Sequence, residues 1–421
     1  MLWLIAVAAV GCDFSITNPG PVQDEFLDNP QAFPGIVNGM GRAYSAALGV
    51  DAFGDFAKIV GCVTREVFPS GNLINHGCDV NEEQGMLVET EETVPWNGGQ
   101  NARFVAEDGI RRMERVLEAA ADNNVNVARG YLWAGFANRL LGENMCEAVF
   151  DGGPREPSSE FLERAESQFT KAIAIASTIG SGQDALRLAA TAGRASVRMH
   201  LGDWQGAVID ASAVPLAFKL QVAFENISVE TYNFWVWSKA SSPFRSVSVW
   251  NTPYLQYYTD YNDPRTPWSY DSRFPYGELA RPCCGRVPFY AQTKYNKVED
   301  PMDIADGREM ALIRAEALLR NGSWPAAMSL INDTLRAPLG VAPWTATSLT
   351  EAWTRLKRER GIELWLEGRR LGDLRRWAAE GTPGSLQPLE DPANPGTYLN
   401  ANRSLCFPVP TSETDTNPNV R

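Results

Sequence analysis

Apolar residues recur at three- and four-residue spacing through several long segments of the chain, a pattern typical of amphipathic helices. The first segment follows Asn29-Pro30 and runs to about Leu48, and the second covers about residues 101–121. Residues 50–100 carry Gly, Asn, Pro and Cys without a sustained period, and they predict a long ordered loop region. Further helices are predicted over 127–144, 159–178, 183–200 and 204–213. Their short connections favour antiparallel helical hairpins.

A short motif occurs twice, at an offset of 120 positions. The first copy reads Gly202-Asp203-Trp204 and the second reads Gly322-Ser323-Trp324. In each, a glycine can end one helix in a left-handed conformation, and Asp or Ser can cap the next helix. The pattern resembles the tetratricopeptide helix hairpin. We therefore expect an all-α fold with tetratricopeptide-like helical hairpins as the scaffold.

Between the two copies lies a segment of a different kind. From Tyr232 to Tyr290, 16 of 59 residues are aromatic, against 10% in the whole chain. Prolines interrupt this segment throughout, and a proline inside a helix costs about 3 kcal/mol. It is therefore predicted to be a large irregular loop region inserted in the scaffold, with short strands such as 244–249.

Composition and charge narrow the possible functions. Hydrophobic residues make up 44% of the chain and charged residues 21%, as in folded proteins. The net charge of −13 argues against a nucleic-acid binder, which needs a surplus of Lys and Arg. The two histidines, His76 and His200, cannot form a multi-histidine metal centre. We expect no metal and no cofactor.

The N-terminus predicts an exported lipoprotein. Residues 1–10 are apolar but would span only about 15 Å as a helix, half of a ~30 Å bilayer core. They fit the apolar part of a signal peptide, here residues 1–12, and the small residues before Cys12 resemble a bacterial lipobox. Acylated Cys12 would hold the protein on a membrane by a lipid anchor, with residues 13–28 as a tether. The alternative is an N-terminal hydrophobic strand.

The other six cysteines suggest disulfides in an exported chain. Cys62 and Cys78 flank a Gly- and Asn-containing loop and are the easiest pair to propose. Zinc bound by Cys62, His76 and Cys78 is the alternative, although no fourth ligand is evident.

The C-terminal quarter carries the most specific pattern. Helices are predicted over 306–320, from Trp324, over 357–367 after a capping box at 348–351, and from Gly368. The motif residues are Arg358-Glu359-Arg360, Ile362-Glu363-Leu364, Glu367-Gly368, Arg370, Asp373-Leu374 and Arg376-Trp377, followed by Phe407-Pro408, Pro410, Ser412-Glu413 and Asn417-Pro418-Asn419. This block resembles the C-terminal signature of the SusD/RagB family.

The resemblance implies a function. Members of that family are lipid-anchored outer-membrane proteins, facing the cell surface, that capture oligosaccharide or peptide nutrients. They deliver these ligands, without cutting them, to a partner TonB-dependent transporter barrel. The chain would then comprise a helical-repeat part (29–215), an aromatic ligand-binding region (216–300) and a C-terminal helical part (301–421), with 13–421 as one compact unit.

We interpret the charged residues of the signature as structural residues that stabilise the fold. Acidic and basic residues alternate over 357–376, as expected for ion-paired helix faces. Arg360 falls on a buried side of its helix and needs a carboxylate, for example that of Glu363 or Glu316. His200 lies near a helix end, and we expect it to cap that end.

Sugar binding needs flat aromatic faces flanked by polar side chains. The candidates in the aromatic segment are Trp235, Trp237, Trp250, Tyr257, Tyr258, Tyr261, Arg265 and Trp268. Trp96 and Asn97, before the second predicted helix, form a second candidate position, where family members often place a binding loop.

Two other classes of function stay open. A glycoside hydrolase needs a pair of carboxylates across a cleft, for which Asp260, Asp263, Asp271 and Glu278 are available. A helical-repeat scaffold that docks other proteins would use the aromatic residues as an interface instead. No nucleophile or zinc-protease motif accompanies the acids. The sequence therefore favours a binding protein over an enzyme.

Overall fold

The computed structural model describes residues 24–50, 56–71, 78–239 and 244–420. The proposed lipidation site at Cys12, the signal peptide and the alternative zinc ligand His76 lie outside these ranges. Among the described residues, no helix combines the length and apolar character that crossing a bilayer requires.

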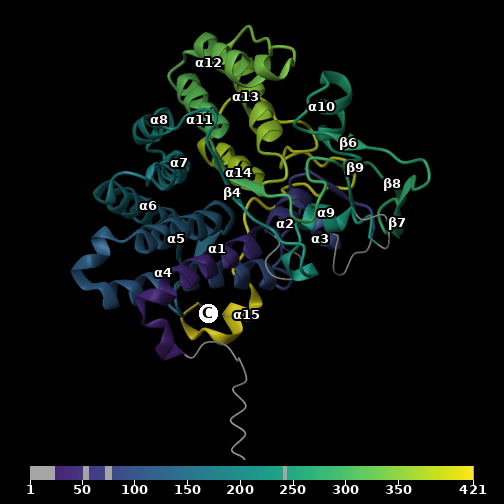
Figure 1. Cartoon of the computed structure of the whole chain (residues 1–421). Helices are drawn as coiled ribbons and strands as arrows, with labels where there is room; N and C mark the ends of the chain where they lie inside the picture. Colours follow the sequence, from purple (N-terminus) through teal and green to yellow (C-terminus); the bar gives the residue numbers. More distant parts are fainter. Residues whose placement is uncertain (1–23, 51–55, 72–77, 240–243, 421) are drawn as a thin grey trace, which may run out of the picture.

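Helices that pack on one another in sequence form the body of the protein, which confirms the predicted all-α, tetratricopeptide-like scaffold (Figure 1). The stack begins with α1 and α4, continues through α5, α6, α7 and α8, crosses to α11, and ends with α12 and α13. The bounds of these helices are α1 (Phe33–Gly49), α4 (Thr93–Leu117), α5 (Val125–Asn144), α6 (Ser159–Ile179), α7 (Asp184–Leu201), α8 (Trp204–Ala213), α11 (Gly307–Arg320), α12 (Trp324–Ile331) and α13 (Leu349–Glu363).

The repeated motif forms the two hairpins α7–α8 and α11–α12. Gly202 and Gly322 both have positive φ, 82° and 76°, a conformation that a Cβ would disfavour. Asp203 caps α8 by accepting a hydrogen bond from Gly206 N at 2.9 Å, whereas Ser323 makes no such bond. The two copies meet where the Arg320 guanidinium lies 4.0 Å from the centre of the Trp204 ring.

The expected loop region over 50–100 is wrong in part. It contains α2 (Phe56–Val63) and α3 (Val80–Glu83), and α4 already begins at Thr93. Every residue of α2 except Lys58 is buried, and its eight residues are too few to show a sustained apolar period. Pro95 is tolerated because the N–H groups of a first helical turn need no partner within the helix.

The aromatic segment leaves and rejoins the scaffold at one place. Strand β4 (Lys219–Val222) pairs antiparallel with β10 (Met302–Asp306), and Val222 lies opposite Met302. The segment between them contains α9 (Phe234–Ser238), α10 (Pro253–Tyr261) and paired short strands, and it lies on the side of the molecule away from α6, α7 and α8 (Figure 1). Those strand pairs are β6 (Trp268–Ser269) with β9 (Ala291–Gln292), β7 (Tyr276–Arg281) with β8 (Gly285–Pro288), and β5 (Val247–Ser248) with β1 (Phe68–Pro69). The prediction of irregular structure with short strands is confirmed, although the strand expected over 244–249 is only the two residues of β5.

The C-terminal signature is buried as a set of ion pairs. Arg360 Nε donates to Asp373 Oδ2 at 2.8 Å, across the contact between α13 and α14 (Arg370–Glu380). The prediction that Glu363 or Glu316 pairs with Arg360 is therefore wrong. Glu316 is instead bound by both terminal nitrogens of Arg376, at 2.5 and 3.0 Å. The interpretation of these charges as scaffold is supported, since their side chains are almost fully buried.

His200 does not cap a helix end. Its side chain is buried, with Nε2 3.5 Å from Glu143 Oε1. Burial lowers the pKa of His200 well below its ordinary value, and the nearby Arg376 guanidinium lowers it further. The imidazole is therefore a neutral core group at physiological pH.

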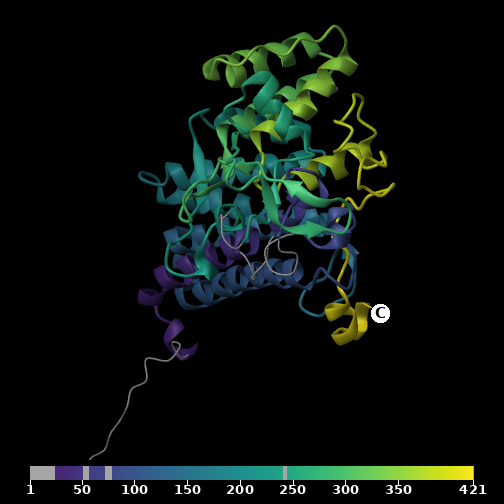
Figure 2. The same cartoon turned by 90° about the vertical axis from the view of Figure 1, so that its right-hand side faces the viewer.

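Disulfides join Cys62 to Cys78, Cys146 to Cys406 and Cys283 to Cys284. Around Cys146 and Cys406 the chain also pairs through its backbone, since Cys146 N donates to Phe407 O at 2.9 Å and Phe407 N donates to Asn144 O at 2.8 Å. The C-terminal helix α15 (Thr411–Thr416) consequently lies at the same end of the molecule as α1 and α4 (Figures 1 and 2).

Candidate functional site

A cavity of about 580 Å³ lies in the aromatic segment and is called the aromatic pocket here. Cavities of this size hold small organic ligands or parts of larger ones. Its walls combine rings with groups that donate or accept hydrogen bonds. They are formed by Tyr232, Val236, Trp237, Lys239, Ser269, Asp271, Arg273, Phe274, Phe289, Ala291, Thr293, Asn296 and Val298.

Helix α9 and the turn at 296–300 form two walls of the pocket and are bonded to each other. Asn233 caps α9 by accepting from Trp235 N at 3.0 Å. The same residue donates from its backbone N to Val298 O and from Nδ2 to Asp300 O, both at 2.8 Å. The position of Trp237 on α9 is therefore fixed relative to Asn296 and Val298.

Lys239 supplies a positive group at the pocket wall. Its Nζ donates to Gln292 O and Asn296 Oδ1 at 3.0 Å each, and also to Tyr295 O. Burial lowers the pKa of Lys239 to about 8, and Asp300 opposes this effect. At neutral pH the ammonium is therefore still charged, but a small change in its surroundings would neutralise it.

Asp271 and Arg273 form an exposed ion pair at the pocket rim, with Arg273 Nη2 2.7 Å from Asp271 Oδ2. Hydrogen bonds from Arg273 lower the pKa of Asp271. Phe274 follows this pair, and the Arg245 guanidinium lies 5.2 Å from the centre of its ring. The rim thus presents both signs of charge beside an aromatic face.

The β6–β9 pair separates the aromatic pocket from a cluster of rings. Successive strand residues point to opposite faces, so Ser269 and Ala291 face the pocket while Trp268 faces away. Trp268 packs edge-on against Tyr290, with ring centres 4.9 Å apart, and against Tyr258, at 5.8 Å. The structure therefore brings together two predicted residues, Tyr258 and Trp268, as a ring cluster rather than in the pocket.

The other predicted aromatic residues do not converge on one site. Trp235 (0% exposed) and Tyr257 (2%) are core residues, and Trp235 Nε1 donates to Leu366 O at 2.8 Å. Trp250 packs edge-on against Phe68 at 5.0 Å, and Tyr261 packs against Trp344 at 5.1 Å with 38% of its surface exposed. Only Trp237 among the predicted aromatics lines the aromatic pocket. Sequence alone could not separate these rings, because no period distinguishes the inner from the outer positions of irregular backbone.

Arg265 is bound within the protein. It donates to Asp263 at 2.7 and 2.9 Å, to Glu359 at 2.7 Å and to Glu363 at 2.6 Å. It lines a neighbouring charged cavity of about 400 Å³ with several acidic and basic side chains. Its five donors are largely occupied, which favours a structural role.

Trp96 and Asn97 lie on α4 beside a shallow pocket of about 380 Å³, called the α4 pocket here. Trp96 is 2% exposed and donates from Nε1 to Glu413 at 3.3 Å, so its ring is part of the core. Asn97 is exposed. Phe104, which is 50% exposed, also lines this pocket and was not predicted from the sequence. It lies two helical turns beyond Asn97 on α4, and this i, i+7 spacing could have indicated that the two residues share a face.

Two of the four acids considered for catalysis are held in ion pairs. Asp263 is paired with Arg265, and Asp271 with Arg273. Asp271 is the only carboxylate among the described residues that line the aromatic pocket. A glycosidase needs two carboxylates across its cleft, and the described residues that line the pocket do not present such a pair.

Within the part of the chain that the structure describes, two groups of side chains are of the types that bind metals: Cys62 with Cys78 and Glu82, and Glu83 with Cys283 and Cys284. In both groups the cysteines are joined in disulfides, which removes the thiolates that would bind a metal.

The comparisons with known proteins agree with this architecture. Residues 308–421 match the model of the SusD family. A laminarin-binding SusD-like protein superposes with a TM-score of 0.68 at 15% identity, over 93% of this chain and 98% of its own. A SusD superfamily protein from Bacteroides thetaiotaomicron gives 0.67 at 14%, over 94% and 98%. A SusD-like carbohydrate-binding protein from Bacteroides vulgatus gives 0.62 at 14%, over 93% and 97%. No curated protein matches the chain in sequence.

The helical stack, with its inserted aromatic segment and C-terminal ion-pair block, is thus the fold of the SusD superfamily. Residues 308–421 match the SusD family, as the C-terminal signature predicts, and the chain as a whole shares the fold of these SusD-like structures.

Proposed function

We propose that this protein is a surface-exposed outer-membrane lipoprotein that binds oligosaccharides and delivers them to a partner TonB-dependent transporter without cutting them. The observation that carries the proposal is the aromatic pocket, in which Tyr232, Trp237 and Phe274 lie beside the exposed charges of Asp271 and Arg273. Rings bind the apolar face of a pyranose, and the charged groups bind its hydroxyls.

Two of the similar structures support this class of ligand. One is a laminarin-binding SusD-like protein and another is a SusD-like carbohydrate-binding protein. The single carboxylate of the pocket supports binding without hydrolysis.

Acylation of Cys12 would hold the folded part at the membrane. The small residues before Cys12, which resemble a lipobox, support a lipid anchor as the attachment. Replacing Cys12 with Ala should move the protein from the membrane fraction to the soluble fraction and abolish labelling by radioactive palmitate. Retention of the label would contradict the anchor at this cysteine.

The ligand is tested with a panel of soluble glycans, laminarin among them, and of peptides, by affinity electrophoresis and calorimetry. Phe274→Ala should weaken binding of the recognised glycan about tenfold or more. The matched control is Ile209→Ala, which removes a side chain that is 62% exposed on α8 and lines none of the pockets described here. Equal loss in both variants, or binding of peptides alone, would contradict the glycan proposal.

The transporter is tested by purification. Detergent extracts of outer membranes that contain the tagged protein should yield a large barrel partner in equal amount. Release of reducing sugar by the purified protein would instead identify a hydrolase and sink the non-catalytic role.

A further inference from the structure

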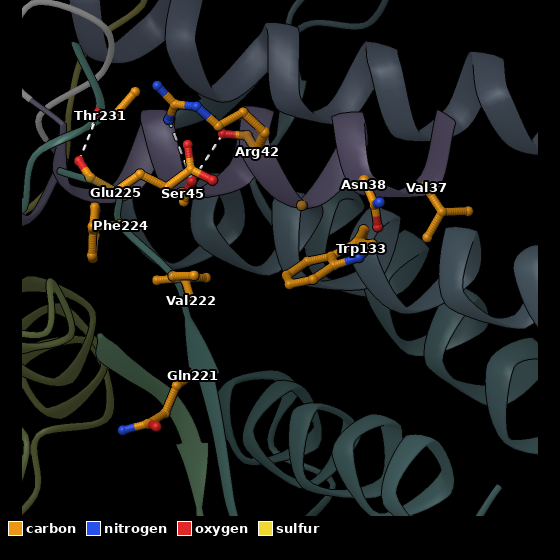
Figure 3. Close-up of a pocket in the computed structure, with 12 residues that line it drawn as sticks. Val37, Asn38, Arg42, Ser45, Trp133, Gln221, Val222, Phe224, Glu225 and Thr231 are labelled. Atoms are coloured by element: carbon orange, nitrogen blue, oxygen red, sulfur yellow. Dashed lines mark hydrogen bonds between the residues drawn. The ribbon is translucent and has the colours of Figure 1, made fainter. Parts of the chain in front are cut away.

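A further cavity, of about 420 Å³, lies between the helical scaffold and the start of the aromatic segment (Figure 3). It is called the α1–β4 pocket here. Helix α1 contributes Asn38, Gly41 and Arg42, helix α5 contributes Trp133, and the chain after β4 contributes Phe224 and Glu225. None of these residues belongs to the candidate positions found from the sequence.

One wall of this pocket is apolar and flat. The half-buried Trp133 ring lies against the backbone of α1, so close that a Cβ at Gly41 would meet the ring at 3.0 Å. Behind it, Tyr44 and Phe136 pack at centre distances of 5.9 and 6.4 Å and hold the ring in place. Val222 continues the apolar wall beside Trp133 (Figure 3).

The rim carries polar groups that no other described residue binds. The indole N–H of Trp133, the amide of Asn38 and the carboxylate of Glu225 have no hydrogen-bond partner within the described part of the chain, although all three line the pocket. Gln221 donates from Nε2 to Asp303 at 2.7 Å, and its side-chain oxygen stays available to accept a hydrogen bond. The Trp133 indole can only donate a hydrogen bond, the Glu225 carboxylate can only accept, and the Asn38 amide can do both.

The loop that carries Glu225 is already ordered. Glu225 N donates to Thr231 O at 2.9 Å, and Thr231 Oγ1 donates back to Glu225 O at 2.7 Å. Arg42 donates to Glu230 O and so bonds α1 to the same loop. A ligand would therefore meet preformed walls, which reduces the entropy lost on binding.

We propose that the α1–β4 pocket is a second sugar subsite, which binds a neutral pyranose unit of the oligosaccharide held in the aromatic pocket. A pyranose has one apolar face for the Trp133 wall and hydroxyls that both donate and accept toward the rim. The opposite charges of Arg42 and Glu225 give no preference for an anion or a cation.

The two cavities adjoin the same stretch of backbone, which favours one chain-like ligand over two separate ones. Thr231 lines the α1–β4 pocket, and the next residue, Tyr232, lines the aromatic pocket. This inference rests on the proposed glycan function and adds a location and a ligand length to it.

The test is a length series of β-1,3-linked and α-1,4-linked gluco-oligosaccharides, from the disaccharide to the hexasaccharide, measured by calorimetry on the whole folded protein. The wild-type protein should bind the longest probe of one series about tenfold or more tighter than the shortest. The double variant Asn38→Ala/Glu225→Gln should lose this gain and bind the hexasaccharide as weakly as the disaccharide. Both substituted residues are exposed, so the variant should fold normally.

Trp133→Phe is the second variant, which keeps an aromatic ring in the wall but removes the indole N–H together with the second ring. Glu163→Gln, an exposed change on α6, is the charge-matched control and should keep the length dependence. An unchanged length dependence in Asn38→Ala/Glu225→Gln would overturn the second subsite while leaving the proposed function standing. Failure of the wild-type protein to bind any probe of either series, together with failure across the glycan panel, would overturn both.

Discussion

The guanidinium of Arg369 donates to both carboxylate oxygens of Glu143, at 2.9 and 3.0 Å, and so joins the C-terminal signature to helix α5. Arg369 also binds Glu309 on α11, at 2.8 Å, and Ser196 on α7, at 2.8 Å. One side chain, within the block that carries the signature, therefore connects three helices of the stack.

Removal of this side chain should be costly. Arg369→Met would leave Glu143 and Glu309 buried without their shared cation, and we expect a loss of about 3–5 kcal/mol in the free energy of unfolding. Urea denaturation measures it. Arg187→Ala, which breaks an exposed ion pair on α7, is the control and should change stability little. Similar stabilities of the two variants would contradict the role given to Arg369.

The disulfide between Cys146 and Cys406 closes a loop with a sequence separation of 260 residues. In the chain-entropy model such a loop contributes up to about 5 kcal/mol. The double variant Cys146→Ser/Cys406→Ser should therefore melt at a clearly lower temperature in calorimetry. Cys283→Ser/Cys284→Ser removes a bond between neighbouring residues, which closes almost no loop and should change the melting temperature little. The reverse order of the two effects would argue against the Cys146–Cys406 pairing.

Substitutions at Trp96 and Asn97 should have different effects, one on the stability of the fold and the other on ligand binding. The Trp96 ring is buried, and Trp96→Ala should destabilise the protein by about 3–5 kcal/mol. Asn97→Ala should leave the melting temperature unchanged, because the amide is exposed. If the α4 pocket binds sugar, the Asn97 variant weakens binding in affinity electrophoresis. A fully stable Trp96→Ala protein would show that the ring is not a core group.

Glu92 should make stability depend on pH. Burial, with repulsion from Glu82, raises the pKa of Glu92 to about 9, above the ordinary value near 4.5. The folded state thus keeps a proton that the unfolded state loses, and this contribution to stability disappears as the pH rises from about 4.5 towards 9. Glu92→Gln should therefore stabilise the protein more at pH 8 than at pH 5, as measured by denaturant unfolding at both values. An equal effect at the two pH values would show that Glu92 is ionised in the core.

The sequence predicted the parts of the fold that have a period. Helices α5, α6, α7 and α8 lie within two residues of their predicted bounds, and in α6 the buried residues recur every three to four positions with exposed positions between them. Helix α2 was not predicted because its eight residues are too few to show a sustained apolar period. The sequence also did not predict Asp373 as the partner of Arg360. Several carboxylates lie in the same charged block, and only the three-dimensional arrangement of α13 and α14 shows which one Arg360 binds.

The candidate site was predicted at the level of a segment and less well at the level of residues. Aromatic content indicated the region that holds the aromatic pocket, yet Trp235 and Trp237 lie two positions apart on one short helix with opposite fates, one in the core and one on the pocket wall. The α1–β4 pocket had no signal at all. Its walls come from segments almost 190 positions apart, and only tertiary contacts bring Asn38 close to Glu225.

The pairing of Val222 with Met302 gives the aromatic segment a single root. A foreign segment that begins and ends at these two positions would meet the same ladder, but it must also replace the bonds from Trp235 to Leu366 and from Arg265 to Glu359. Chimaeras that exchange residues 223–301 between relatives should therefore fold where the incoming segment supplies these contacts. Ligand recognition can therefore change by replacement of this segment while the helical scaffold keeps its sequence.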